Sequence, residues 1–274
     1  CLGEFCLFLR PSELDETIER LGQLLSSPND SVVSASLTTV GVVLEHYAVY
    51  PERFHEPERT VELRRRKLAG MLLKGLASYR SAVRQEAMWV FGRGLFGSDV
   101  LSEADKEKLF TLVAKKLLFL FSEYPGGELT LFYRAAALSH LYRFLIRHQI
   151  AVGDFPFERR SKVAFFPGTF DPFTLSHKGI VREIRDMGFE VFLAVDEFSW
   201  SKKTQPSLVR RQIVGLSVAD EFHVHLFPHD IPVNIANPHD LHRLRRLFAG
   251  RELYLAVGSD VVAGASPYRA EPGE

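Results

Sequence analysis

The chain has 274 residues, with 34 lysines and arginines against 34 aspartates and glutamates. This balance excludes a global field for nucleic acid or an anionic membrane, so neither is an expected partner. The only cysteines, Cys1 and Cys6, lie together, which excludes a disulfide framework and a cysteine-rich zinc site. With 46% hydrophobic residues and no apolar run as long as a membrane span, the composition indicates a soluble cytoplasmic protein. Because the chain begins at a cysteine, we expect a fragment of a longer protein.

The first 152 residues show the periodicity of helices throughout. Apolar residues recur three and four positions apart within six segments, over residues 14–25, 32–50, 61–79, 82–95, 103–121 and 131–146. No alternating strand pattern competes with them. The sequence therefore predicts an all-helical domain over residues 1–152.

Three of these helices share a faint repeat at a spacing of about fifty residues. The alignment places Val83 and Tyr133 on Val32, and Gly92 on Gly41, and it continues through Ala137, Leu138 and Leu141. The segment from Val83 to Ala87 resembles the V-R-x-x-A helix of HEAT-type repeats. We expect a HEAT-like stack of helix pairs, with a simple helical bundle as the alternative. Such a domain either presents a surface to a protein partner or stabilises the domain that follows it.

Two groups of polar residues resemble binding sites but have simpler interpretations. Arg64, Arg65, Arg66 and Lys67 form a basic run without stacking aromatic residues, so we expect a solvated helix face instead of a nucleic-acid site. His223 and His225 alternate on one strand, but no carboxylate or cysteine follows at ligand spacing. We therefore expect no metal-ligating residues.

Beyond a connector near residues 152–156, strands and helices alternate. Strands are expected over residues 163–166, 189–195, 223–227 and 253–257, with a helix in each interval and the last helix over 236–248. This order predicts a parallel sheet with right-handed crossovers. The expected fold class is therefore α plus α/β, with the α/β domain over residues 161–274.

The turn after the first strand is the most informative part of the chain. Its residues run Pro-Gly-Thr-Phe-Asp-Pro over 167–172, and Gly168 with the two prolines forbids continuation as a strand or a helix. Beyond the turn, Thr174 or Ser176 can cap a helix that ends at Gly188. Unpaired N–H groups and the positive end of the helix dipole would then lie above the strand, where an anion binds.

These residues resemble the signature of the nucleotidyltransferase superfamily that adenylates nicotinate or nicotinamide mononucleotide and phosphopantetheine. The family motif is G-T/S-F-D/N-P followed by H/T-x-x-H. Its first half matches Gly168, Thr169, Phe170 and Asp171, and its second half begins at Thr174 and ends at His177, with Ser176 where bacterial members usually have glycine. The resemblance implies a Rossmann-like domain that transfers AMP from ATP to a phosphate-bearing acceptor and releases pyrophosphate, with Mg²⁺ on the phosphates. Within it, His177 and Thr174 would be catalytic, and the turn residues with Ser176 would bind the nucleotide.

Two later segments resemble other parts of the same family. Lys202 and Lys203 follow the second expected strand, and Arg210 begins the next helix, so the resemblance assigns Lys203 to catalysis and Lys202 and Arg210 to charged substrate groups. After the last expected strand, the residues Gly258, Ser259 and Asp260 resemble the family's G-A/S-D element, which approaches the ribose or base. Asn234 lies where relatives place residues that select the acceptor.

The chain departs from the family at its end, because the usual I-S-S/T-x-x-R segment is absent before Glu274. We therefore expect the second domain to be incomplete at its C-terminus. Nicotinate or nicotinamide mononucleotide is the first expected acceptor. The alternatives are a phosphopantetheine adenylyltransferase, a cytidylyltransferase, and a non-catalytic nucleotide-sensing or scaffold protein.

Overall fold

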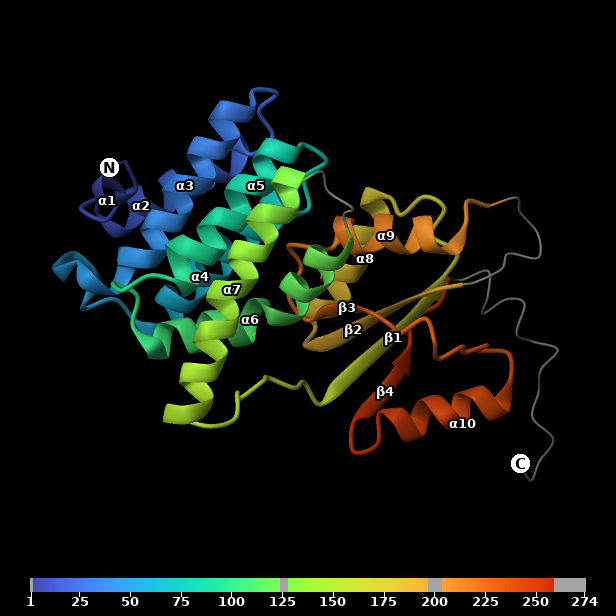
Figure 1. The fold of residues 1–274 in the computed structure, drawn as a ribbon. Helices are drawn as coiled ribbons and strands as arrows, with labels where there is room; N and C mark the ends of the chain where they lie inside the picture. Colours follow the sequence, from blue (N-terminus) through green and yellow to red (C-terminus); the bar gives the residue numbers. More distant parts are fainter. Residues whose placement is uncertain (1, 124–127, 197–203, 259–274) are drawn as a thin grey trace. The chain divides into compact units, whose positions relative to one another are not determined.

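The computed structural model describes residues 2–123, 128–196 and 204–258 (Figure 1). The chain divides into two compact units, Cys1–Glu158 and Arg159–Glu274. The division falls in the connector between the two expected domains. Each unit is described by itself below.

All regular secondary structure in the described part of the first unit is helical, and all six expected helices are present. They are α2 (Pro11–Leu24), α3 (Asp30–His46), α4 (Glu58–Leu76), α5 (Ser81–Trp89), α6 (Glu103–Glu123) and α7 (Glu128–Ala151). A short helix α1 (Leu2–Cys6) and the 3₁₀ turns η1 (Tyr47–Val49) and η2 (Pro51–Arg53) were not expected. The helix expected over 82–95 has two parts, because α5 continues as a π-helical segment, η3 (Val90–Phe96).

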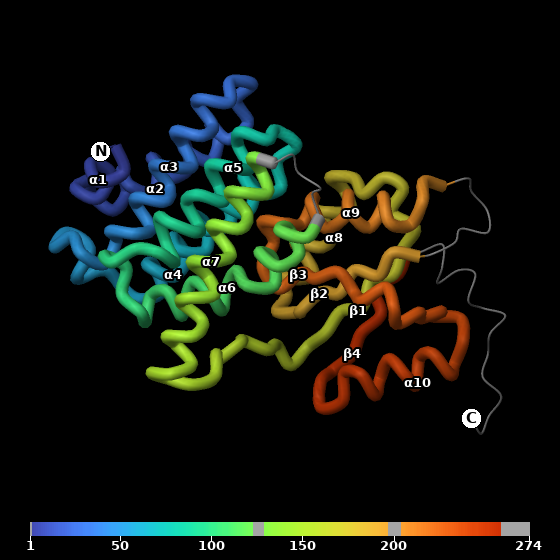
Figure 2. The backbone as a smooth tube through the Cα atoms, in the orientation of Figure 1, coloured from blue at the N-terminus to red at the C-terminus, as the bar shows by residue number. Residues whose placement is uncertain are grey.

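The helices of this unit form two layers. The helices α3, α5 with η3, and α7 lie side by side in one layer, and α4 packs against α6 in the other (Figure 2). Two glycines allow the close approach within the first layer. A Cβ atom on Gly41 would lie 2.5 Å from Cγ1 of Val90, and a Cβ atom on Gly92 would lie 2.7 Å from Cα of Ala137. Any side chain at either position would therefore push the neighbouring helix away.

Helix α3 corrects one expectation, because the stretch Asp30–Val49 is long and apolar enough to cross a membrane by length and composition. Its apolar residues, however, form part of the core of the helical unit. Val33, Leu37, Val40 and Val43 are each at most 1% exposed, and α3 packs against α4 and α5. Half of the most apolar window of this stretch is buried inside the structure.

The expectation of a solvated basic face is wrong for Arg64 and Arg65, whereas Lys67 is exposed as expected. Arg64 is buried, and its guanidinium donates to both carboxylate oxygens of Asp15 at 2.7 and 3.0 Å and to the Tyr47 hydroxyl at 2.7 Å. Arg65 pairs with Glu62 and Asp105, at 2.8 Å each. Arg64 and Arg65 therefore join α4 to other helices by ion pairs, because Asp15 and Asp105 lie far away in sequence.

The second unit contains a four-stranded parallel sheet. Along the chain its elements are β1 (Lys162–Gly168), α8 (Leu175–Asp186), β2 (Phe189–Val195), α9 (Ser207–Ser217), β3 (Val224–Leu226), α10 (Pro238–Leu247) and β4 (Glu252–Leu255). The strand order is β3-β2-β1-β4, with Val163 opposite both Glu190 and Leu253. The chain thus steps outward from β1 to β3 and then returns to the other side of β1.

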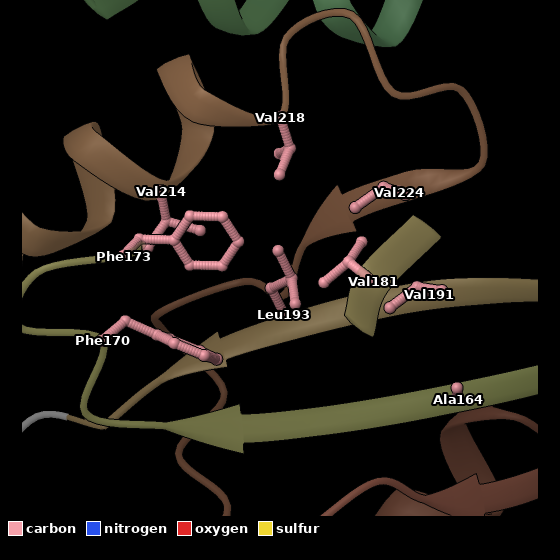
Figure 3. Close-up of a cluster of buried hydrophobic side chains, with 9 residues drawn as sticks. All are labelled: Ala164, Phe170, Phe173, Val181, Val191, Leu193, Val214, Val218 and Val224. Carbon is pink, nitrogen blue, oxygen red and sulfur yellow. The ribbon is translucent and has the colours of Figure 1, made fainter. Parts of the chain in front are cut away.

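The two faces of the sheet have separate hydrophobic cores. On one face, α8 and α9 cover a cluster in which Ala164, Val191 and Leu193 pack against Val181 and Val214, and Phe170 and Phe173 close its end (Figure 3). On the other face, Leu244 and Phe248 of the α10 segment pack against Val163 and Phe165. The expected combination of a helical unit and a mixed unit with a parallel sheet is confirmed.

Candidate functional site

The turn after β1 has an unusual backbone. Phe170 adopts φ = 46°, a left-handed conformation that is rare for a residue other than glycine, and the peptide bond between Asp171 and Pro172 is cis. The Phe170 ring is buried and folds back over Gly168, where a Cβ atom would lie 2.9 Å from Cζ of the ring. Glycine is therefore required at 168 for this ring position.

The side chain of His177 is fixed from two directions. Its Nδ1 atom lies 3.0 Å from the backbone N of Thr174 and 2.8 Å from the Thr174 hydroxyl, and the His177 N–H donates back to that hydroxyl at 3.4 Å. The imidazole also stacks on Phe173 at 5.5 Å between ring centroids and meets the edge of Phe170 at 5.5 Å. Because a backbone N–H can only donate, Nδ1 is the acceptor and the ring proton resides on Nε2. His177 thus presents a donor away from its own helix.

Thr174 is the N-cap of α8 and so determines where this helix begins. Its side chain and that of His177 form a reciprocal capping box. The next two residues, Leu175 and Ser176, are exposed in the first turn, and no described residue accepts from their N–H groups. These N–H groups and the helix dipole favour an anion at this end of α8.

A cavity of about 590 Å³ lies at the carboxyl ends of β1 and β4. It is lined by the turn residues Gly168, Thr169, Phe170 and Asp171, together with the expected site residues His177 and Gly258. Its other walls come from residues Phe166, Pro167, Pro172, Ile180, Ile184, Thr204, Ala256 and Val257. The strand order reverses between β1 and β4, and open α/β sheets bind ligands at such a reversal. The volume lies within the range of small-molecule sites.

Several expected site residues are not part of this wall. Thr174 and Ser176 are exposed beside the cavity and do not line it. Lys202, Lys203, Ser259 and Asp260 lie outside the described residues. Thr204, which directly follows Lys203, does line the cavity. Within the described part of the wall there is no lysine or arginine, so its possible donors are His177, the hydroxyls of Thr169 and Thr204, and backbone N–H groups.

Arg210 takes a different position from the one that the resemblance implied. Its side chain is fully buried, at 0% exposure, and does not line the cavity. The guanidinium donates to three backbone carbonyls, at 2.8 Å to Gln205, 2.5 Å to Thr169 and 2.7 Å to Asp196. These carbonyls belong to the turn after β1, the end of β2 and the residues that precede α9. Arg210 therefore joins the segments around the site instead of facing a ligand.

A second cavity of about 260 Å³ lies at the carboxyl ends of β2 and β3. Asp196, Arg211, Asn234 and Asp240 contribute polar groups to its wall. Burial raises the pKa of the Asp196 carboxyl, and the charge of Arg210 offsets part of this rise. The Asn234 side chain accepts from the N–H of Ala236 at 3.0 Å, so its carbonyl oxygen stabilises the loop.

The described residues contain no group of three or more histidines, cysteines, aspartates or glutamates that could hold a metal ion. Of the two strand histidines, His225 contacts Glu190 at 3.0 Å, and Glu190 also pairs with Arg251. His223 adopts φ = 60° just before β3. Both residues contribute to the local structure around β3.

The apolar wall of the larger cavity was not predicted from the sequence. Ile180 and Ile184 lie three and seven residues after His177, so they share its side of α8. This spacing was the signal that could have identified them. Phe173, which orients the imidazole by stacking, gave no comparable signal because an aromatic residue in a turn is usually assigned to the core.

Comparison with known proteins adds no relative, since no family model, no curated protein and no solved structure matches the chain. A function for this chain must therefore be inferred from its own residues and geometry. Two observations matter most. The first half of the motif, from Gly168 to Pro172, lines one cavity together with His177, and that cavity lies where the strand order reverses.

Proposed function

We propose that this chain is a nucleotidyltransferase that transfers AMP from ATP to the phosphate of nicotinate or nicotinamide mononucleotide. The proposal depends above all on His177, whose Nε2–H donor is held by Thr174 and by aromatic stacking at the wall of the larger cavity. The strand order β3-β2-β1-β4 supports a Rossmann-like assignment, because it equals the order of the first four strands of that fold. The capped end of α8 beside the cavity further favours a phosphate ligand.

The reaction would be a direct displacement at the α-phosphate. An oxygen of the acceptor phosphate forms a bond to this phosphorus, the bond to the β-phosphate oxygen breaks, and pyrophosphate leaves with the electron pair. Negative charge increases on the oxygens around the phosphorus as this happens, and His177 would donate its Nε2–H to one of them. Thr174 would act by holding the imidazole. Positioning and charge stabilisation account for catalysis without a covalent intermediate.

The wall suits Mg²⁺ that arrives on the phosphates. Asp171 is the one carboxylate among the described residues of this wall, and one of its oxygens accepts from the Gln205 N–H at 2.8 Å. Mg²⁺ in nucleotide sites commonly takes one or two carboxylates besides phosphate oxygens and water. Asp171 would thus be the protein ligand, and the ion would neutralise the developing charge.

The two cavities also suit a reaction of two substrates. The larger would take the nucleoside triphosphate, with Gly258 allowing close approach of a ribose or base. The smaller, which contains Asp196 and Asn234, would take the acceptor. The turn residue Thr169 and the β2 end at Asp196 are both bound by Arg210, which would keep the two substrate positions in register.

Pyrophosphate release tests the proposal. The protein is offered Mg²⁺ with ATP or CTP, each against nicotinate mononucleotide, nicotinamide mononucleotide and phosphopantetheine. We expect release with ATP and one of the two mononucleotides. His177→Ala should lower kcat by at least a hundredfold, because removal of a donor to a developing oxyanion typically costs this much.

His239→Ala is the matched control, since His239 also lies in the first turn of a helix but is exposed and lines neither cavity. Its turnover should equal that of the unaltered protein. Release with CTP or with phosphopantetheine would replace the proposed substrates by the corresponding alternative. Nucleotide binding without release for any pair would instead identify a non-catalytic nucleotide-sensing module.

A further inference from the structure

Helix α7 carries a long row of exposed apolar side chains. The row consists of Leu131, Leu138, Tyr142, Ile146 and Ile150, which are 60%, 40%, 65%, 38% and 82% exposed. Their spacing of four and seven residues places them on one side of the helix, over roughly 28 Å at 1.5 Å per residue. A continuous apolar surface of this length usually marks an interaction site. We call it the α7 row.

The row faces away from the rest of the helical layer. On the opposite side of α7, Ala137 packs against Gly92, and Thr130 accepts from the Gln85 side chain at 3.3 Å. His140 likewise lies against Gly97, where a Cβ atom would be 2.4 Å from its Nδ1. Because α5 and η3 occupy that side, the row is the side on which a further helix of the same layer would pack.

The internal repeat supports a helix as the occupant. Gly41 of α3 and Gly92 of η3 occupy equivalent repeat positions, and each contacts the next helix of the layer. The third copy continues from Leu141 to Tyr142, which takes the glycine position and lies in the exposed row. A tyrosine there holds an incoming helix further away than glycine does. The occupant is therefore a helix that packs on the row without repeating the earlier contact.

The charges beside the row specify the chemistry of that helix. Arg143 and Arg147 are exposed one turn apart along one edge of the row. Arg143 contacts the His140 ring and the Ser139 carbonyl, and no carboxylate of the described residues pairs with either arginine. Between residues 129 and 151, α7 has no acidic residue at all. Two copies of α7 would therefore bring like charges together, whereas carboxylates one turn apart on another helix would pair with both arginines.

We propose that the α7 row is the docking surface for an amphipathic helix of a partner protein, with carboxylates flanking its apolar side. The apolar contacts would supply most of the affinity, and Arg143 and Arg147 would fix the direction and register of the helix. An acidic lipid surface would also attract these cations, but it requires no spacing of one turn along a single edge. This inference concerns the helical unit and does not depend on the proposed enzymatic activity.

Fluorescence anisotropy with two designed 20-residue helical peptides tests the proposal. Both peptides carry a leucine row, one with glutamates along one edge, four residues apart, and the other with lysines at the same positions. The glutamate peptide should bind at least tenfold more tightly than the lysine peptide. The double variant Arg143→Glu/Arg147→Glu should reverse this preference, and Tyr142→Asp should weaken binding of the glutamate peptide at least tenfold.

Arg59→Glu is the control for a change of net charge, because Arg59 is exposed on α4 and lies far from α7 in sequence. It should alter neither affinity by more than twofold, and circular dichroism should show unchanged helix content in every variant. Equal or absent binding of the two peptides would overturn the proposal. So would flotation with phosphatidylserine vesicles that Tyr142→Asp abolishes, or self-association that this variant abolishes, because the occupant would then be a lipid surface or a second copy.

Discussion

Replacement of Arg210 distinguishes between two roles for this residue. One is the joining of backbone segments that the structure shows, and the other is the phosphate contact that the resemblance implied. The buried guanidinium donates to the carbonyls of Thr169, Asp196 and Gln205. A hydrogen bond from a charged donor contributes roughly 1.5–3 kcal/mol, but three orphaned carbonyls would regain some water through the adjacent cavities. We therefore expect Arg210→Met to lower the free energy of unfolding of the second unit by about 3–5 kcal/mol, as for other broken buried ionic networks.

Hydrogen exchange followed by mass spectrometry is the appropriate assay, because a chain of two units does not unfold in a single two-state step. A loss of 3 kcal/mol corresponds to a roughly hundredfold loss of protection, which should appear in peptides that cover β1 and β2. Peptides from α3 and α4 serve as the internal control and should not change. Arg210→Lys keeps the charge but cannot reach three carbonyls at once. Its protection of β1 and β2 should therefore fall between that of Arg210→Met and that of the unaltered protein.

Nucleotide affinity, measured in parallel by calorimetry, decides between the two roles. If Arg210 bound phosphate directly, Arg210→Met would weaken binding while leaving the protection of β1 and β2 intact, and removal of a buried charge would even be tolerated. That outcome would refute the structural role. The expected result is lost protection together with weaker nucleotide binding, and partial recovery of both in Arg210→Lys.

Three further predictions address the site and the helical core. Gly168→Ala should lower the free energy of unfolding by about 1–3 kcal/mol and raise KM for nucleotide, because the new methyl group would displace the buried Phe170 ring 2.9 Å away. Thermal unfolding and steady-state kinetics would measure the two effects. Asp196→Asn should raise the melting temperature at pH 7, since burial raises the pKa of this carboxyl and its ionised form destabilises the fold. The gain should vanish below about pH 4, where the carboxyl is protonated in both the folded and the unfolded protein. Burial raises the pKa of Tyr47 from 10.0 to about 12. The protonated Tyr47 hydroxyl therefore contributes fully to the free energy of unfolding below pH 10, and this contribution should fall by roughly 2–3 kcal/mol as the pH approaches 12. Urea unfolding followed by circular dichroism at 222 nm should show this fall in the unaltered protein and a smaller one in Tyr47→Phe. Parallel curves of unfolding free energy against pH for the two proteins would contradict the raised pKa of Tyr47.

The elements of this fold could be predicted from the sequence because their signals are local. Apolar spacing located the six long helices, and the turn at Gly168 located the junction of β1 and α8. The π-helical continuation of α5 was not predictable, since its residues keep an ordinary helical pattern. It lies where η3 packs against α7 at Gly92 and Gly97. The π-helical geometry therefore accompanies contact with another helix, which no local sequence pattern encodes.

The direction of a charged side chain was the least predictable property. Arg64 and Arg210 both lie in amphipathic segments, and in sequence both look like residues of a solvated or ligand-facing surface. Both are buried because their partners come from distant parts of the chain, Asp15 for Arg64 and Thr169 for Arg210. Long side chains can turn either way from the same helix position, so only tertiary contacts decide.

The buried position of Arg210 also indicates how this site would bind phosphate. In a planar trans peptide the carbonyl and the following N–H point in opposite directions. Because Arg210 binds the carbonyl of Thr169, the N–H of Phe170 is directed away from the guanidinium, and Thr169 and Phe170 both line the cavity. The arginine would thus act on the nucleotide through the orientation of a backbone donor. Phosphate binding would then depend on the backbone geometry of a turn that holds both a left-handed Phe170 and a glycine at 168.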